Sequence, residues 1–185
     1  MKRVTSVLAA AGLALVIGAT SAQAQSLSVG VGGGIVQPLG DFKDLSKLGF
    51  HGSALVGYSL PSGLGFRGEF FYSQNKFKDD VSAVVGDGKV KMAAGIGSVT
   101  YSFKTTGSIT PYVLGSIGYF NAKVESELGD DSESKIGFGG GAGLKFPLGS
   151  DGGFFVESRY LSVSTSGSKT NFIPVTVGVT FGLGK

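Results

Sequence analysis

The sequence contains no cysteine and no tryptophan, and it has a single histidine among its 185 residues. Without cysteine there is neither a disulfide framework nor a thiolate metal site, and one histidine alone makes a poor metal site. The absence of tryptophan, together with scattered basic residues, removes the usual platform on which single-stranded nucleic acid stacks. We therefore expect no metal, no cofactor and no nucleic-acid partner.

Long hydrophobic runs are also missing after the first two dozen residues. The chain begins with a basic pair and a short apolar core, Val7 to Ile17, and Ala22-Gln23-Ala24 has the small residues of a cleavage site. This core is too short for a transmembrane helix. We predict a cleaved secretory signal peptide over residues 1–24 and one exported domain over residues 25–185. No cysteine follows the predicted cleavage site, so a lipid anchor is excluded there, and the rest of the chain cannot form a helical membrane protein.

Glycine and alternation are what the sequence has in abundance. Glycine accounts for 33 residues, several of them inside strand-like runs such as Gly137 to Gly143, which is typical of a crowded barrel interior. From Ile173 to Leu183 every second residue is apolar, and the residues between are small, polar or proline. A period of two places these sets on opposite faces of a strand, and six apolar side chains on one face would span roughly 30 Å, about enough to cross a tilted bilayer.

Eight strand-like segments follow one another along the predicted domain. They lie at roughly 26–36, 49–60, 64–75, 90–104, 109–124, 135–147, 154–163 and 170–183. The connections between them alternate between short turns and longer, charged loops, as they do in transmembrane barrels, where the short turns are periplasmic. The sequence therefore predicts an all-β, eight-stranded antiparallel up-and-down transmembrane β-barrel with both chain ends on the periplasmic side.

The composition of the polar face indicates whether the apolar face of the predicted strands points outward to lipid or inward to a core. Alternation alone fits a lipid-facing barrel and a soluble barrel with an apolar core equally well. Here the polar face is mostly glycine and serine, and its mid-strand charges are nearly balanced, which suits a narrow interior where unpaired charge is costly. We predict a salt-bridge core in the lumen, formed by Arg67, Glu69, Lys145, Glu157 and Arg159. The same charges leave open a narrow ion path.

Several short motifs, taken in order, resemble those of the small outer-membrane β-barrels of the OmpA/OmpX and opacity-protein type. They are Gly40-Asp41-Phe42, Thr110-Pro111-Tyr112-Val113 and the glycine-rich Phe138 to Pro147. The last strand resembles the C-terminal signal read by the barrel-assembly machinery, through Thr176, Gly178, Phe181 and Leu183. The resemblance implies a monomeric or weakly associating barrel that acts through its surface loops, in envelope integrity, adhesion, host contact or minor porin activity.

Two further motifs could carry chemistry. His51 and Ser53 share one strand face, as the His-x-Ser pair of outer-membrane lipid A deacylases does, but they lie in the second strand without the flanking pattern of those enzymes and face the predicted lumen. A polar lumen contact is therefore the favoured interpretation. Clustered carboxylates can gather divalent cations that bridge to lipopolysaccharide phosphates, and the third long loop has Glu125, Glu127, Asp130, Asp131 and Glu133. Their spacing matches no defined calcium loop, which favours a solvated acidic loop.

These observations predict a non-enzymatic envelope protein with a structural or adhesion-like role through its extracellular loops. The expected partners are outer-membrane lipid and lipopolysaccharide, the barrel-assembly machinery and a host or cell-surface ligand. The alternative is a minor porin that conducts small solutes or ions. A soluble, lipocalin-like carrier is a third hypothesis, disfavoured by the missing Gly-x-Trp opening and by the C-terminal assembly pattern.

Overall fold

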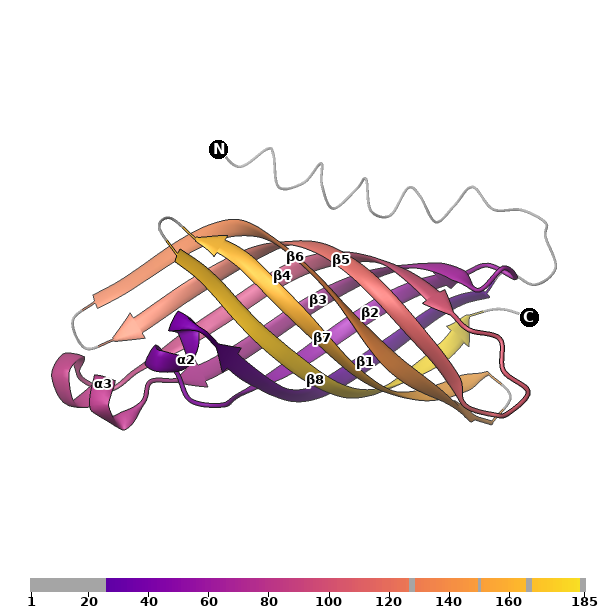
Figure 1. The fold of residues 1–185 in the computed structure, drawn as a ribbon, viewed down its shortest axis with the longest axis horizontal. Helices are drawn as coiled ribbons and strands as arrows, with labels where there is room; N and C mark the ends of the chain where they lie inside the picture. Colours follow the sequence, from indigo (N-terminus) through magenta and orange to yellow (C-terminus); the bar gives the residue numbers. More distant parts are fainter. Residues whose placement is uncertain (1–25, 127–128, 150, 166–167, 184–185) are drawn as a thin grey trace.

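The computed structural model describes residues 26–126, 129–149, 151–165 and 168–183, and over them the chain forms one closed barrel (Figure 1). Each strand pairs antiparallel with its neighbours in sequence, and the first strand closes on the last. The strands are β1 (Ser26–Leu39), β2 (Gly49–Ser59), β3 (Leu64–Lys76), β4 (Gly88–Ser102), β5 (Thr110–Ser126), β6 (Gly129–Leu148), β7 (Gly152–Thr165) and β8 (Ser168–Leu183). The predicted eight-stranded antiparallel barrel is confirmed.

The two ends of the barrel are built differently. One end, called here the turn end, holds the short connections that follow β2, β4 and β6, and β1 begins and β8 ends there (Figure 1). In the first of these turns Gly63 has a φ of 90°, and a Cβ at this position would lie 2.5 Å from the carbonyl oxygen of Ser102. Only glycine takes this conformation and this close approach without strain.

The opposite end, called here the loop end, holds the longer connections. They include the short helices α2 (Asp41–Leu45) and α3 (Asp79–Val85) (Figure 1). No helix in the described part of the chain is long and apolar enough to cross a membrane. The loops that contain α2 and α3 are joined, because the Lys47 amide donates to the Lys76 carbonyl (2.8 Å) and the Lys78 amide to the Leu45 carbonyl (3.1 Å).

Large apolar side chains cover the outside of the barrel. Phe50 is 71 % exposed and Ile117 62 %, exposures that a water-soluble protein rarely tolerates over a whole surface. In β5, where both faces are apolar and alternation is ambiguous, the outward set is Val113, Ile117 and Tyr119. The outward aromatic residues include Phe66, Phe70, Tyr72, Tyr101, Phe138, Tyr160 and Phe181. Such a belt is the expected surface of a barrel in a hydrocarbon environment.

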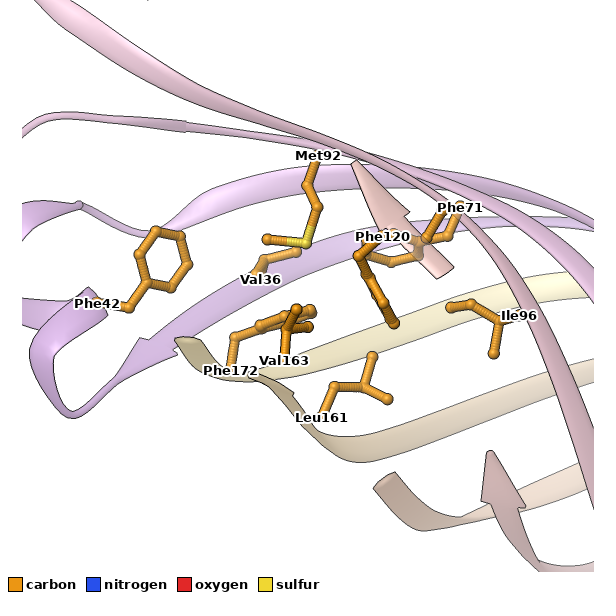
Figure 2. Packing of buried hydrophobic residues seen from close by; sticks show 10 residues of the cluster. Val36, Phe42, Phe71, Met92, Ile96, Phe120, Leu161, Val163 and Phe172 are labelled. Carbon is orange, nitrogen blue, oxygen red and sulfur yellow. The ribbon is translucent and has the colours of Figure 1, made fainter. Parts of the chain in front are cut away.

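The lumen departs from the polar interior that we expected. Toward the loop end it is filled by an apolar cluster, which Figure 2 shows from close by. Its members are Val36, Phe42, Phe71, Met92, Ala94, Ile96, Phe120, Leu161, Val163 and Phe172. The Phe172 ring lies at its centre, with ring centroids 6.3–6.4 Å from those of Phe42, Phe71 and Phe120. Phe42 comes from α2, so the first loop folds back over the lumen and closes it.

The third long connection is also different from the prediction. We expected a charged loop at 125–134, but β5 continues to Ser126 and β6 starts at Gly129, so that most of this segment is a β-hairpin. β6 pairs with β7 only from Gly137 onward, and the hairpin therefore extends beyond β7 (Figure 1). The charged residues of this segment suggested a loop. They are equally compatible with a strand whose side chains are solvated, and here the backbone pairs with β5.

Candidate functional site

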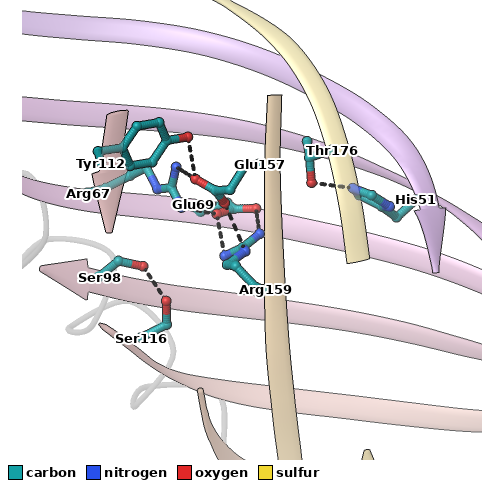
Figure 3. Close-up of polar contacts among 9 residues, drawn as sticks. All are labelled: His51, Arg67, Glu69, Ser98, Tyr112, Ser116, Glu157, Arg159 and Thr176. Carbon is teal, nitrogen blue, oxygen red and sulfur yellow. Dashed lines mark hydrogen bonds and ion pairs between the residues drawn. The ribbon is translucent and has the colours of Figure 1, made fainter. Parts of the chain in front are cut away.

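Four of the five predicted lumen charges form one ion-pair network, shown in Figure 3. Arg67 on β3 donates two hydrogen bonds to Glu157 on β7, at 2.7 and 2.9 Å. Arg159 on β7 donates two to Glu69 on β3, at 2.9 and 2.7 Å. Paired hydrogen bonds between a guanidinium and a carboxylate are among the strongest polar contacts in proteins. The network contains two positive and two negative charges, so it is neutral.

Each carboxylate in this network also contacts the second arginine. Arg159 Nε lies 3.0 Å from Glu157 Oε1, and Arg67 Nη2 lies 3.7 Å from Glu69 Oε2. Arg159, Glu157 and Glu69 are almost completely buried. The four side chains therefore fix β3 to β7 across the lumen, although these strands are not neighbours in the barrel wall.

Lys145 stands apart from the ion pairs that we expected it to join. Its Nζ lies 5.0 Å from the centre of the Tyr112 ring, and it forms no ion pair with a described residue. Tyr112 Oη instead donates a hydrogen bond to Glu157 Oε2 at 2.7 Å. The Lys145 ammonium group thus packs over the face of the Tyr112 ring, which is a favourable cation–π contact.

Glycines on β6 make room for these large side chains. A Cβ at Gly143 would lie 2.5 Å from the Tyr112 ring, and one at Gly141 would collide with the Ser158 carbonyl and the Arg159 side chain. Gly141 and Gly143 are therefore explained by the bulk of the network side chains on the neighbouring strands β5 and β7. On the turn-end side of the ion-pair network, Phe155 is buried beside Gly178.

His51 lies between the ionic network and the apolar cluster. Its Nε2 is 2.9 Å from Thr176 Oγ1, and its ring stacks on Phe71 with a centroid distance of 5.0 Å (Figure 3 shows the first contact). Ser53, the second member of the His-x-Ser motif, is buried without a hydrogen-bond partner among the described residues. His51 Nε2 is thus engaged with Thr176 and not with Ser53, so the two residues of the His-x-Ser motif do not pair with each other.

The carboxylates of the predicted acidic loop lie on the β5–β6 hairpin, and two of them are paired with lysines. Glu125 is paired with Lys89, Lys91 and Lys123, at 3.4, 2.7 and 3.2 Å, and Glu133 with Lys135 at 2.8 Å. Glu127 and the Asp130 side chain lie outside the described residues, and the described part of the chain holds no group of three or more metal-ligating side chains. Lysines on β4, β5 and β6 thus pair with Glu125 and Glu133, which agrees with the favoured interpretation of a solvated acidic segment. Cation binding by these carboxylates stays a hypothesis.

A cavity of about 590 Å³ opens at the loop end between the α3 loop and β4. Lysines and carboxylates line it in equal number, namely Lys47, Lys76, Lys89, Asp79, Asp87 and Glu125. Hydrogen bonds from Lys91 and Lys123 lower the pKa of Glu125 to about 2. The cavity is therefore a mixed-charge surface without a net attraction for ions of one sign.

The residues proposed as an assembly signal divide between the two faces of β8. Thr176 and Gly178 point into the lumen, where Thr176 contacts His51 and a Cβ at Gly178 would lie 2.5 Å from the Phe155 ring. Phe181 and Leu183 point outward and are about half exposed. Their role in assembly stays a prediction.

The chain matches the outer membrane protein beta-barrel domain family over residues 8–181. It belongs to that family. The comparison with curated proteins gave no match. Among solved structures, neisserial surface protein A has 18 % identity and a TM-score of 0.70, with 87 % of this chain and 100 % of that chain covered.

Two other solved outer-membrane barrels share the fold. A major outer membrane protein from Thermus thermophilus has 14 % identity and a TM-score of 0.59, covering 87 % of this chain and 100 % of that chain. Ail from Yersinia pestis, solved with the heparin analogue sucrose octasulfate, has 23 % identity and a TM-score of 0.51, covering 85 % and 97 %. The predicted family is thus confirmed, and the identities establish a common fold.

Sequence reasoning missed the apolar half of this outer-membrane barrel's lumen. One signal was present in the consecutive aromatic residues Phe70, Phe71 and Tyr72, because neighbours in a strand point to opposite faces. At that level both faces must be apolar. The contribution of Phe42 has no such signal, since it comes from a helix in a loop.

Proposed function

We propose that this outer-membrane barrel is a non-enzymatic surface-interaction protein that acts through its loop end. In the proposed orientation the turn end faces the periplasm and the loop end faces the exterior, because short turns are periplasmic in such barrels. The observation that carries the proposal is the contrast between a filled lumen and a structured loop end. Function in rigid scaffolds usually lies in the segments that the scaffold presents.

The filled lumen supports this proposal over the minor porin. The neutral network of Arg67, Glu69, Glu157 and Arg159 crosses the lumen, and the apolar cluster closes it on the loop side. Ions would have to displace bidentate ion pairs and then pass an apolar layer rich in aromatic rings, both of which are costly.

The loop end has features of a contact surface. The α2 and α3 loops are joined by backbone hydrogen bonds and by the Lys47–Asp79 ion pair at 2.6 Å. Beside them the β5–β6 hairpin extends beyond β7. Exposed cations, including Lys43 and Lys169, make a sulfated glycan a suitable first probe, and Ail was solved with a heparin analogue.

The test compares loop variants of the whole barrel in lipid nanodiscs, with binding to immobilised heparin and to cultured host cells as readouts. One variant replaces 41–45, with the buried Phe42 kept, and 79–85 by glycine–serine segments of equal length. A matched control alters Thr106 and Gly107 in the turn after β4, where a Cβ on Gly107 would meet nothing within 4 Å. We expect binding by the parent and the control, and its loss in the loop variant. Equal binding after both loops are replaced, or stepwise conductance of the parent in planar bilayers, would contradict the proposal.

A further inference from the structure

A second hollow lies on the outside of the barrel, over β2 and β3 close to the loop end. It has a volume of about 410 Å³, and apolar surface dominates its lining. Leu48, Phe50 and Tyr72 provide apolar walls, Gly52 contributes to the lining, and Lys47 and Lys76 stand at the loop-end edge. The groove therefore combines an apolar floor with two cations at one end.

The strand register explains why there is a hollow here. Gly52 is the partner of Tyr72 on one side and of Gly33 on the other, so two adjacent wall positions lack a side chain. A Cβ at Gly52 would have only the Gly32 carbonyl oxygen near it, at 4.0 Å. The space above Gly52 is thus open, and Phe50 and Tyr72 rise on its sides.

The two lysines are positioned but weakly engaged. Their backbones are joined by the Lys47 amide, which donates to the Lys76 carbonyl. Lys47 pairs with Asp79, but both side chains are solvent-exposed, at 45 % and 93 %, and such a pair contributes little stability. Lys76 is exposed and has no ion pair with a described residue. The Lys76 ammonium group is therefore available to an anionic ligand, and the Lys47 ammonium group would exchange its solvent-exposed partner Asp79 for that ligand.

We propose that this groove binds the phosphorylated glycolipid of the outer leaflet, with an acyl chain over Gly52 between Phe50 and Tyr72 and a phosphate between Lys47 and Lys76. Four residues of strand, about 13 Å, separate Tyr72 from Lys76, which suits an amphiphile with its tail in the membrane and its head at the surface. The charge complementarity of two lysines with a lipid phosphate selects this ligand over a neutral lipid. The inference rests on the proposed orientation of the barrel but not on the surface-interaction role.

The test uses native mass spectrometry of the whole detergent-solubilised barrel with purified lipid A, and separately with phosphatidylglycerol as a phosphate-bearing phospholipid. Gly52→Leu fills the groove, and Lys76→Glu reverses a charge at its edge. Gly115→Leu is the matched control, because Gly115 also faces outward and a Cβ there would meet nothing within 4 Å. Lys169→Glu controls for a charge reversal elsewhere at the loop end.

We expect one lipid A per barrel to persist at low lipid concentration, and Lys76→Glu to weaken its binding about 10-fold, as loss of one charged contact would. Gly52→Leu should weaken binding to a similar extent, because the leucine side chain takes the space of the acyl chain. Both controls should bind like the parent. Equal retention of phosphatidylglycerol, or lipid A binding unaffected by the groove variants, would overturn the assignment. Heat-dependent mobility on SDS gels verifies folding, and Lys76→Glu, on an exposed side chain, carries the test if Gly52→Leu does not fold. Failure here leaves heparin and cell binding through the loops untouched.

Discussion

Removing one arginine from the lumen network should destabilise the barrel more than removing that arginine and its partner together. Arg159 has both hydrogen bonds to Glu69 and a further contact with Glu157. In Arg159→Met, Glu69 loses its close partner, since Arg67 is 3.7 Å away and already engaged with Glu157. A buried charge deprived of its partner costs about 3–5 kcal/mol.

The reciprocal variant, Glu69→Leu, leaves Arg159 with an excess positive charge in the same buried place and should cost a similar amount. Independent effects would then add to roughly 6–10 kcal/mol in the double variant. The double variant instead keeps the neutral Arg67–Glu157 pair with its two hydrogen bonds. Apolar replacement of a whole buried ion pair is often close to neutral, so we expect a cost below about 2 kcal/mol.

The measurement is the free energy of unfolding in urea for each purified barrel in the same lipid. Because the chain has no tryptophan, the transition is followed by far-ultraviolet circular dichroism and by the fraction that migrates as folded on unboiled gels. Lys145→Met is the control, since Lys145 contacts only the Tyr112 ring among these groups and should cost about 1 kcal/mol. Additive losses in the double variant, or a single variant as stable as the parent, would refute the reasoning.

Three further predictions concern the apolar cluster, the hairpin and the glycine-rich strand. Phe172→Ala should lower the free energy of unfolding by about 3–5 kcal/mol, because the ring is fully buried among three others; a loss below about 1 kcal/mol in the urea titration would contradict this packing role. The carboxyl ¹³C shift of Glu125 should titrate near pH 2, its pairing being present above the ordinary pKa and lost as the pH falls toward 2; Lys91→Gln should raise the pKa, and an unchanged midpoint would argue against the pairing. Gly141→Ala should impair folding on gels because its Cβ meets the backbone of β7, whereas Gly115→Ala should fold like the parent; equal folding of both would contradict the wall geometry.

Much of the barrel wall was readable from the sequence because a period of two is a local property. In β7, Glu157 and Arg159 alternate with outward Val156 and Tyr160, and no distant residue is needed to assign their faces. The pairing inside the lumen is a different matter. That Arg67 meets Glu157 depends on how β3 and β7 face each other across the closed barrel, which follows from tilt and closure.

The features that the sequence did not indicate depend on loops that fold onto the barrel and on contacts between residues of different strands. Phe42 lies in a loop helix, and only its packing against Phe172 reveals that it belongs to the interior. The length of the β5–β6 hairpin was hidden by its charges, because composition alone does not separate a solvated strand from a solvated loop. The groove beside Gly52 depends on the neighbouring Gly33, which lies in another strand.

The seam between β1 and β8 has a consequence for how the barrel folds. It joins residues at opposite ends of the domain, from Leu27 with Leu183 to Leu39 with Asn171. The eighth strand must therefore find the first, and contacts of such sequence separation make folding slow. Until that meeting, two strand edges carry unpaired amide and carbonyl groups, each costing several kcal/mol in hydrocarbon. Membrane insertion and closure of the seam should accordingly be one cooperative step, and a chain that ends before β8 should stay outside the bilayer.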